Sequence, residues 1–217
     1  MIELLLIRHG ETEWNVEKRL QGHRDITLNR EGVRQSLALG RCLLDEPLDA
    51  IYSSDLQRAL HTAQAIATPR GMHIQLEKGL RERCFGAFEG MVHPEIDARY
   101  PLDYAAWQRR DVDARYPSGE FHAETLREFA DRTLVCIERI AASHPENSRV
   151  ILVTHGGVLD TVYREATGMA YELPRSFDVL NASINRVKWD GSRFHIVKWA
   201  DVSHLTRASL DEIDHLQ

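Results

Sequence analysis

Two histidines follow runs of aliphatic residues, and a glycine comes after each. Residues 2–7 precede Arg8 and His9, and residues 150–153 come just before the segment that contains His155. Such runs are typical of parallel strands buried on both faces, and the glycine lets a ligand approach the backbone. If the two strands are neighbours, both imidazoles face one crevice at the carboxyl ends of the strands, where α/β proteins bind ligands.

Two further charged residues follow other predicted strands. Arg58 is expected in the first turn of a helix that starts near residue 56, where backbone N–H groups already favour an anion. Glu82 follows a third predicted strand and opens an irregular segment. Taken alone, Arg58 is as readily explained as a solvated surface residue, and Glu82 is more readily explained as a solvated carboxylate. Their significance depends on whether they meet the two histidines.

Together these residue types suit phosphoryl transfer, which requires a nucleophile, positive groups on the non-bridging oxygens and a proton for the leaving oxygen. A neutral His9 imidazole can be the nucleophile. Arg8 and Arg58 can bind phosphate oxygens in bidentate fashion and stay charged, and His155 can donate to another oxygen. Glu82 can supply the proton. Two arginines and a second histidine provide the positive field, so no metal ion or other cofactor is required.

Composition narrows the function classes. The chain has 217 residues and a formal net charge of −6, so we expect neither a nucleic-acid partner nor an anionic membrane surface. It contains no HExxH, DxDxDG or GxxxxGK motif, which argues against a metallohydrolase or an NTPase. The apolar run at 2–7 is too short for a signal peptide or a membrane span. Cys42, Cys84 and Cys136 are few and widely spaced, which favours reduced thiols and a cytoplasmic location.

The order of predicted elements favours a three-layer α/β/α sandwich with a mostly parallel central sheet. Asp190-Gly191 is a strong turn signal for a closing hairpin. The predicted strands are 2–7, 50–53, 72–76, 150–153, 183–189 and 194–199, and the predicted helices are 28–44, 56–67, 124–142 and 156–167.

Several local signals accompany these elements. Thr27 or Asn29 can cap helix 28–44, and Asp55 can cap helix 56–67. The apolar face expected for helix 28–44 consists of Val33, Leu37, Gly40 and Leu44. Residues 84–121 have no sustained periodicity, so we expect one domain over 1–217 with a lid-like insertion there.

Residues 6–15, LIRHGETEWN, closely resemble the signature of the histidine phosphatase superfamily, which includes the cofactor-dependent phosphoglycerate mutases. The resemblance continues in the family's order over most of the chain. It includes Gln21-Gly22, SSDLQRA at 53–59, LRE at 80–82, and THGG at 154–157.

The resemblance implies that His9 is the phosphorylated nucleophile and that Arg8, Arg58 and His155 complete the phosphate pocket. It implies that Glu82 is the general acid and then the base that activates water.

The resemblance also implies residues that contact phosphate or line the substrate side. Alternatives remain for some of them, because Thr12 and Asn15 can also cap a helix and Gly22 can also serve a turn. The implied set is Thr12, Asn15, Gln21, Gly22 and the backbone of Gly156.

The segment after Glu82 bears on the type of reaction. Residues 84–91 lack the tyrosine and lysine that mutases carry, which resembles the broad-specificity phosphatase branch. Arg109-Arg110 instead resemble the paired arginines that mutases use on a substrate carboxylate. Residues 117–120 resemble a phosphatase pattern, although Phe121 replaces its serine.

We therefore expect a metal-independent phosphatase that hydrolyses small organic phosphate monoesters. A 2,3-bisphosphoglycerate-dependent phosphoglycerate mutase is the alternative, and a non-catalytic phospho-ligand binding module is a third hypothesis. The sequence leaves the substrate open among sugar phosphates, phosphoglycerates, nucleotides and a cobalamin-precursor phosphate. A homodimer through the hairpin that carries Trp189 and Trp199 is also left open.

Overall fold

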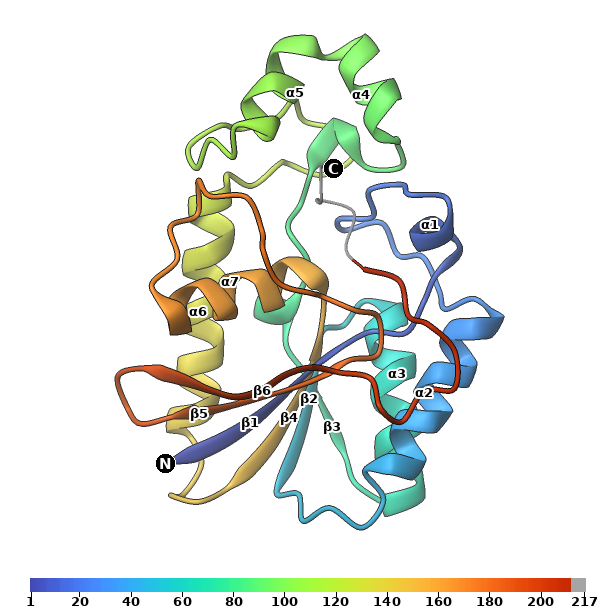
Figure 1. Ribbon diagram of the computed structural model, residues 1–217, viewed down its shortest axis with the longest axis vertical. Helices are drawn as coiled ribbons and strands as arrows, with labels where there is room; N and C mark the ends of the chain where they lie inside the picture. Colours follow the sequence, from blue (N-terminus) through green and yellow to red (C-terminus); the bar gives the residue numbers. More distant parts are fainter. Residues whose placement is uncertain (212–217) are drawn as a thin grey trace.

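A six-stranded sheet forms the centre of the computed structural model, which describes residues 1–211 (Figure 1). The strand order is β3-β2-β4-β1-β5-β6. The first four strands in this order are parallel to one another, β5 is antiparallel to β1, and β6 is antiparallel to β5. The strands are β1 Ile2–Arg8, β2 Ala50–Ser53, β3 Ile74–Leu76, β4 Arg149–Thr154, β5 Ile184–Trp189 and β6 Phe194–Asp201.

Helices cover both faces of this sheet. Helices α2 and α3 lie on one face and α6 and α7 on the other, which confirms the predicted three-layer α/β/α architecture (Figure 1). No helix within residues 1–211 is long and apolar enough to cross a membrane. The α-helices are α1 Glu13–Val16, α2 Arg30–Cys42, α3 Gln57–Ala67, α4 His93–Arg99, α5 Pro101–Gln108, α6 Leu126–Ala142 and α7 Gly156–Thr167; the 3₁₀ helices are Thr68–Arg70, Lys78–Leu80 and Gly86–Phe88.

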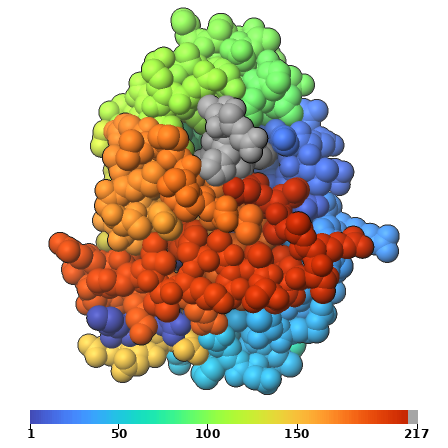
Figure 2. Space-filling view, in the orientation of Figure 1, coloured from blue at the N-terminus to red at the C-terminus, as the bar shows by residue number. Residues whose placement is uncertain are grey.

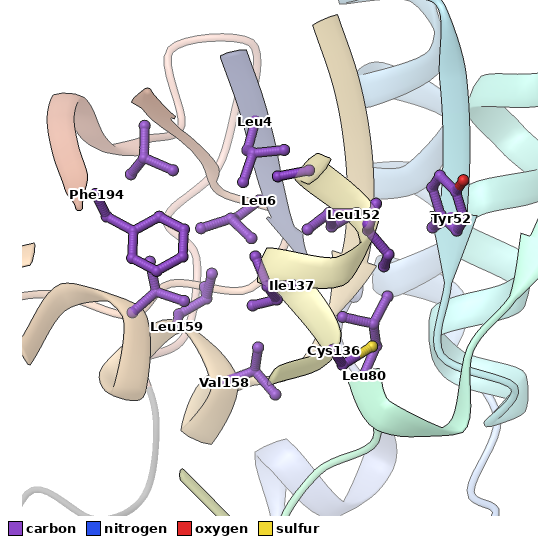
Figure 3. Packing of buried hydrophobic residues seen from close by; sticks show 14 of the residues in the cluster. Leu4, Leu6, Tyr52, Leu80, Cys136, Ile137, Leu152, Val158, Leu159 and Phe194 are labelled. Carbon is purple, nitrogen blue, oxygen red and sulfur yellow. The ribbon is translucent and has the colours of Figure 1, made fainter. Parts of the chain in front are cut away.

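Strand β1 is buried on both of its faces. Leu4 and Leu6 point toward α6 and α7, where they join Ile137 and Leu152 in one apolar cluster (Figure 3). Leu5 points the other way, toward α2 and α3. Each fully buried aliphatic side chain contributes about 1.5–3 kcal/mol. The continuous aliphatic run of the sequence is therefore explained by two cores that share one sheet.

Residues 84–121 form a separate lobe at one end of the molecule, carrying α4 and α5 (Figures 1 and 2). The lobe has its own apolar cluster, which includes Phe88, Ile96, Tyr104 and Tyr116 and is joined by Leu20. The segment consists of short helices and loops, and its role as a lid-like insertion in a single domain stays a prediction.

The predicted apolar face of α2 is wrong. Val33 and Leu37 are 48% and 51% exposed, and Leu44 lies beyond the end of the helix. Small residues face α3 and the first loop instead, because the backbones approach closely: a Cβ on Gly40 would lie 2.2 Å from the Ala65 carbonyl oxygen. The helix begins after Asn29, whose side chain accepts from the Gly32 N–H, as expected.

Asp55 does not cap α3. Its carboxylate forms a bidentate ion pair with Arg81 at 2.6 and 2.7 Å, which lowers the pKa of Asp55. The N–H of Gln57 at the start of α3 donates to Asp25 Oδ1 at 2.7 Å. The cap therefore comes from a loop distant in sequence, and local spacing does not reveal it.

Two leucines of α2 provide a test of the corrected packing. We expect Leu39→Ala to cost about 2–5 kcal/mol of unfolding free energy, because Leu39 is fully buried and its truncation leaves a cavity. Leu37→Ala should stay within about 0.5 kcal/mol of the parent, since half of that side chain is exposed. Urea unfolding of both variants measures the difference, and equal losses would contradict the assigned helix face.

Candidate functional site

His9 and His155 are brought together by the pairing of β1 with β4. The register ends at Arg8 opposite Thr154, and the two imidazole centroids lie 5.2 Å apart. His9 Nδ1 lies 2.7 Å from the Gly10 carbonyl oxygen. Because a carbonyl oxygen only accepts, Nδ1 carries the proton and Nε2 keeps its lone pair. The expected crevice therefore contains a histidine whose Nε2 is suited to attack.

The surroundings keep both imidazoles neutral. Burial, followed by the positive charges of Arg58 and Arg8, lowers the pKa of His9 well below its ordinary value. The pKa of His155 is also well below its ordinary value because of burial and the charge of Arg58. His155 Nε2 lies 2.8 Å from Ser54 Oγ, a partner that the sequence interpretation did not single out.

Arg58 lies in the first turn of α3 and lines the same pocket as His9. Its Nη1 donates to the Arg24 carbonyl and its Nη2 to the Gly22 carbonyl, both at 2.8 Å. Gly22 has a φ of +51°, and a Cβ there would lie 2.0 Å from a carboxylate oxygen of Glu89. Gly22 therefore serves a turn, and its carbonyl orients Arg58. Gln21 lines the pocket next to it.

Arg8 lies differently from Arg58. It is fully buried, its Nη1 donates to the Val179 carbonyl at 2.7 Å and to the Leu210 carbonyl at 3.3 Å, and it is not among the residues that line the pocket. Its charge still lowers the pKa of His9. The structure thus places Arg8 beside the nucleophile, with a hydrogen-bonded connection to the chain segments around residues 179 and 210.

Glu82 lies across the pocket at the N-terminus of α7. Its Oε2 accepts from the Gly157 N–H at 3.0 Å, and its Oε1 accepts from the Arg83 N–H at 2.7 Å. A Cβ on Gly157 would lie 2.3 Å from Oε1, so only glycine allows this approach. Arg132 of α6 stabilises the segment that carries Glu82, because it donates to the carbonyls of Gly79 and Glu82.

Thr12 and Asn15 form the capping box of α1 and do not line the pocket. Asn15 Oδ1 accepts from the Thr12 N–H at 3.0 Å, and the Asn15 N–H donates to Thr12 Oγ1. The Nδ2 of Asn15 is buried without a hydrogen-bond partner among the residues that the structure describes. Gly156 is the first residue of α7, directly after His155. The pocket is lined by Gly157 and not by Gly156.

The two adjacent arginines of the insertion do not converge on the pocket. Arg109 is exposed, whereas Arg110 lines the pocket and pairs with Asp160 at 3.1 Å. Arg83 is a pocket cation that the sequence interpretation missed. It is 5% exposed, and its guanidinium lies 4.7 Å from the centre of the Tyr116 ring. Its position directly after Glu82 was the only available signal.

The pocket thus combines a neutral histidine, cations and a carboxylate with an apolar wall. The space within it, part of which is open to solvent, is about 810 Å³. Within residues 1–211, no three His, Cys, Asp or Glu side chains are grouped so that they could hold a metal ion. The apolar wall includes Leu20, Phe85, Trp107, Tyr116, Leu126 and Phe129.

Comparison with known proteins gives consistent matches. The model of the histidine phosphatase superfamily (branch 1) matches residues 4–202. Phosphoglycerate mutase-like protein 4 of Arabidopsis thaliana is 36% identical over 94% of this chain and 86% of its own length. The metal-independent phosphoserine phosphatase of the same plant is 37% identical over 94% and 83%. The solved structure of Bacillus stearothermophilus YhfR has a TM-score of 0.85 at 33% identity and covers 94% of this chain and 99% of that one.

The free energy of unfolding should fall as the pH drops below about 6.5. In the unfolded chain, histidines protonate near that pH, whereas folded His9 and His155 stay neutral to lower pH. The unfolded state then binds more protons and is favoured, by about 1.4 kcal/mol per pH unit for each such histidine.

Urea unfolding at about pH 7.5 and 5.5 measures this slope. His155→Gln should reduce it, whereas the exposed His73→Gln should not. An unchanged slope in the His155 variant would show that its imidazole is not buried in the neutral form.

Proposed function

The chain belongs to the histidine phosphatase superfamily, and we propose that it is a metal-independent phosphatase that hydrolyses small organic phosphate monoesters through a phosphohistidine on His9. One observation carries this proposal. His9 is held neutral, with Nδ1 bound to the Gly10 carbonyl, in a pocket that also contains Arg58 and Glu82.

The first step forms the phosphoenzyme. Arg58 and His155 bind non-bridging oxygens, and His9 Nε2 attacks phosphorus in line with the ester oxygen. The N–P bond forms as the P–O bond to the organic group breaks, and Glu82 gives its proton to the departing oxygen. The Gly10 carbonyl stabilises the positive charge on the phosphorylated imidazole through Nδ1–H.

The second step returns the enzyme to its initial state. The Glu82 carboxylate accepts a proton from water, which attacks phosphorus while the N–P bond breaks. Inorganic phosphate leaves, His9 regains its lone pair, and Glu82 is protonated for the next cycle. Two backbone N–H groups, those of Arg83 and Gly157, hold the Glu82 oxygens in place for both proton transfers.

A phosphoglycerate mutase is the second candidate. The names of several relatives and the presence of Arg110 in the pocket favour it. Against it, Arg109 points to solvent and Arg110 is engaged by Asp160. The paired arginines therefore do not support a mutase in the way their adjacency suggested. The cytoplasmic location and the homodimer stay predictions from the sequence.

We also propose that the substrate carries a carboxylate near the phosphate ester, as phosphoserine does. Arg83 is buried in the pocket wall, where burial lowers its pKa. Its Nε and Nη2 donate to the carbonyls of Glu124 and Ala114, and its side chain also hydrogen-bonds with that of Tyr116. The Glu124 carboxylate acts on it by charge, but within residues 1–211 that carboxylate is paired with Arg132, and no acid forms an ion pair with Arg83. A substrate carboxylate would supply the missing counter-charge. The name of the phosphoserine phosphatase relative supports this class.

A phosphate-release assay in EDTA tests the enzyme class. We expect hydrolysis of p-nitrophenyl phosphate and phosphoserine by the parent protein and its loss in His9→Ala. Glu82→Gln should lower kcat by about 10²–10⁴-fold, because it removes the proton donor. Isomerisation of 3-phosphoglycerate that depends on 2,3-bisphosphoglycerate, with little hydrolysis, would establish the mutase instead.

Arg83→Met tests the substrate class. A hydrogen bond between charged groups contributes about 1.5–3 kcal/mol, so kcat/KM for phosphoserine should fall about 10- to 150-fold. The value for p-nitrophenyl phosphate, which lacks a carboxylate, should change by less than about threefold. Arg109→Met serves as the matched control because Arg109 is exposed. Equal losses on both substrates would refute the carboxylate assignment.

A further inference from the structure

The loop 21–24 holds the phosphate-binding arginine of the proposed reaction. The two carbonyls that accept from Arg58, those of Gly22 and Arg24, both belong to this loop. An arginine whose Nη donors are fixed by two carbonyls can present its remaining edge in only one orientation. Whatever fixes the loop therefore also fixes how Arg58 meets a phosphoryl group.

Glu89 is the side chain that ties this loop to the insertion. Its Oε1 accepts from the His23 N–H at 2.9 Å and from the Phe85 N–H at 3.1 Å, and Cys84 Sγ lies 3.4 Å away. Gly22 packs against the same carboxylate, so closely that a Cβ would overlap with it. One oxygen atom thus joins two segments that are about sixty residues apart in sequence.

Burying the Glu89 carboxylate costs free energy unless these contacts stabilise it. Its side chain is 8% exposed, and burial raises its pKa. Its Oε2 is buried without a hydrogen-bond partner among the described residues. Arg24, whose charge acts on Glu89, forms an ion pair with Glu120. The stabilising contacts of Glu89 are therefore concentrated on the backbone of the loop and of the turn that faces it.

We propose that Glu89 is a positioning residue, which sets the orientation of Arg58 through loop 21–24 and thereby the affinity of the site for the phosphoryl group. This inference rests on the proposed phosphatase function. The chain of contacts runs from Glu89 to the His23 N–H and Gly22, and from the Gly22 carbonyl to Arg58.

A second route from Glu89 leads toward the proton donor. His23 Nε2 lies 2.9 Å from the Glu82 carbonyl oxygen, so a shift of loop 21–24 can reach that loop as well. The two routes differ in their signature. Misplacing Arg58 weakens phosphate binding whatever the leaving group, whereas misplacing Glu82 slows poor leaving groups most.

The experiment measures the inhibition constant of inorganic phosphate and the kcat of several aryl phosphates that differ in leaving-group pKa. In Glu89→Ala, phosphate should bind about tenfold more weakly, since the loss of roughly one hydrogen bond to the loop is about 1 kcal/mol or somewhat more. The dependence of kcat on the leaving group should be unchanged. Glu89→Gln, which keeps an acceptor oxygen, should stay within about threefold of the parent.

A double-mutant cycle identifies the route. Lysine at position 58 cannot donate to both carbonyls as arginine does. When Glu89→Ala is added to a protein that already carries Arg58→Lys, phosphate affinity should therefore fall by less than about a further twofold. Additive losses, a steeper leaving-group dependence, or unchanged phosphate binding in Glu89→Ala would each overturn the proposal. If Glu89→Ala does not fold, Glu89→Asp gives the same test, because its shorter side chain withdraws the oxygen while retaining the charge.

Calorimetric binding of inorganic phosphate separates this inference from the proposed function. Binding requires no turnover, so a parent protein that binds phosphate but hydrolyses no ester would defeat the phosphatase proposal and leave Glu89 testable. A parent protein that hydrolyses esters, with a Glu89→Ala variant that binds phosphate equally well, would defeat only the positioning role.

Discussion

The parallel pairing of β1 with β4 is the constraint on which the rest of the site depends. Because the register ends with Arg8 opposite Thr154, the next residue of each strand is a histidine at the same edge of the sheet. A shift of the register would separate the two imidazoles along the strand axis and move the side chains of β1 out of their two cores. The aliphatic residues of both strands therefore stabilise the fold and align the histidines at once.

Close backbone approach is the second requirement, and glycine meets it at Gly22 and Gly157. Each allows a carboxylate to lie where a Cβ would otherwise be: Glu89 at Gly22, and Glu82 at Gly157. The first contact organises the loop that orients Arg58, and the second places a carboxylate at the N-terminus of α7, where the helix dipole favours negative charge. Two parts of the pocket wall thus depend on the same close packing of a carboxylate against a glycine.

Much of the fold was predictable because burial on both faces leaves a continuous aliphatic pattern, as in residues 2–7 and 150–153. The face of α2 was not, since its buried face consists mostly of small or polar residues beside Leu39, whereas its large apolar residues Val33 and Leu37 are exposed. The motifs identified His9, Arg58 and Glu82, which the structure places around one pocket. Arg83 and Ser54 escaped notice because their contacts are with residues distant in sequence, and Arg109 and Arg110 were paired only by adjacency.

The lobe formed by residues 84–121 has an apolar core of its own, apart from the two cores of the sheet. Trp107 and Tyr116 belong to the cluster of this lobe and line the pocket. Substituting them changes the pocket wall and leaves the packing of β1 against β4, which aligns His9 and His155, in place. Selection can therefore change which organic group fits while the phosphorus chemistry is retained. A chain built in this way can vary the residues that shape substrate preference separately from those that align the two histidines, since most of each set packs in a different apolar cluster.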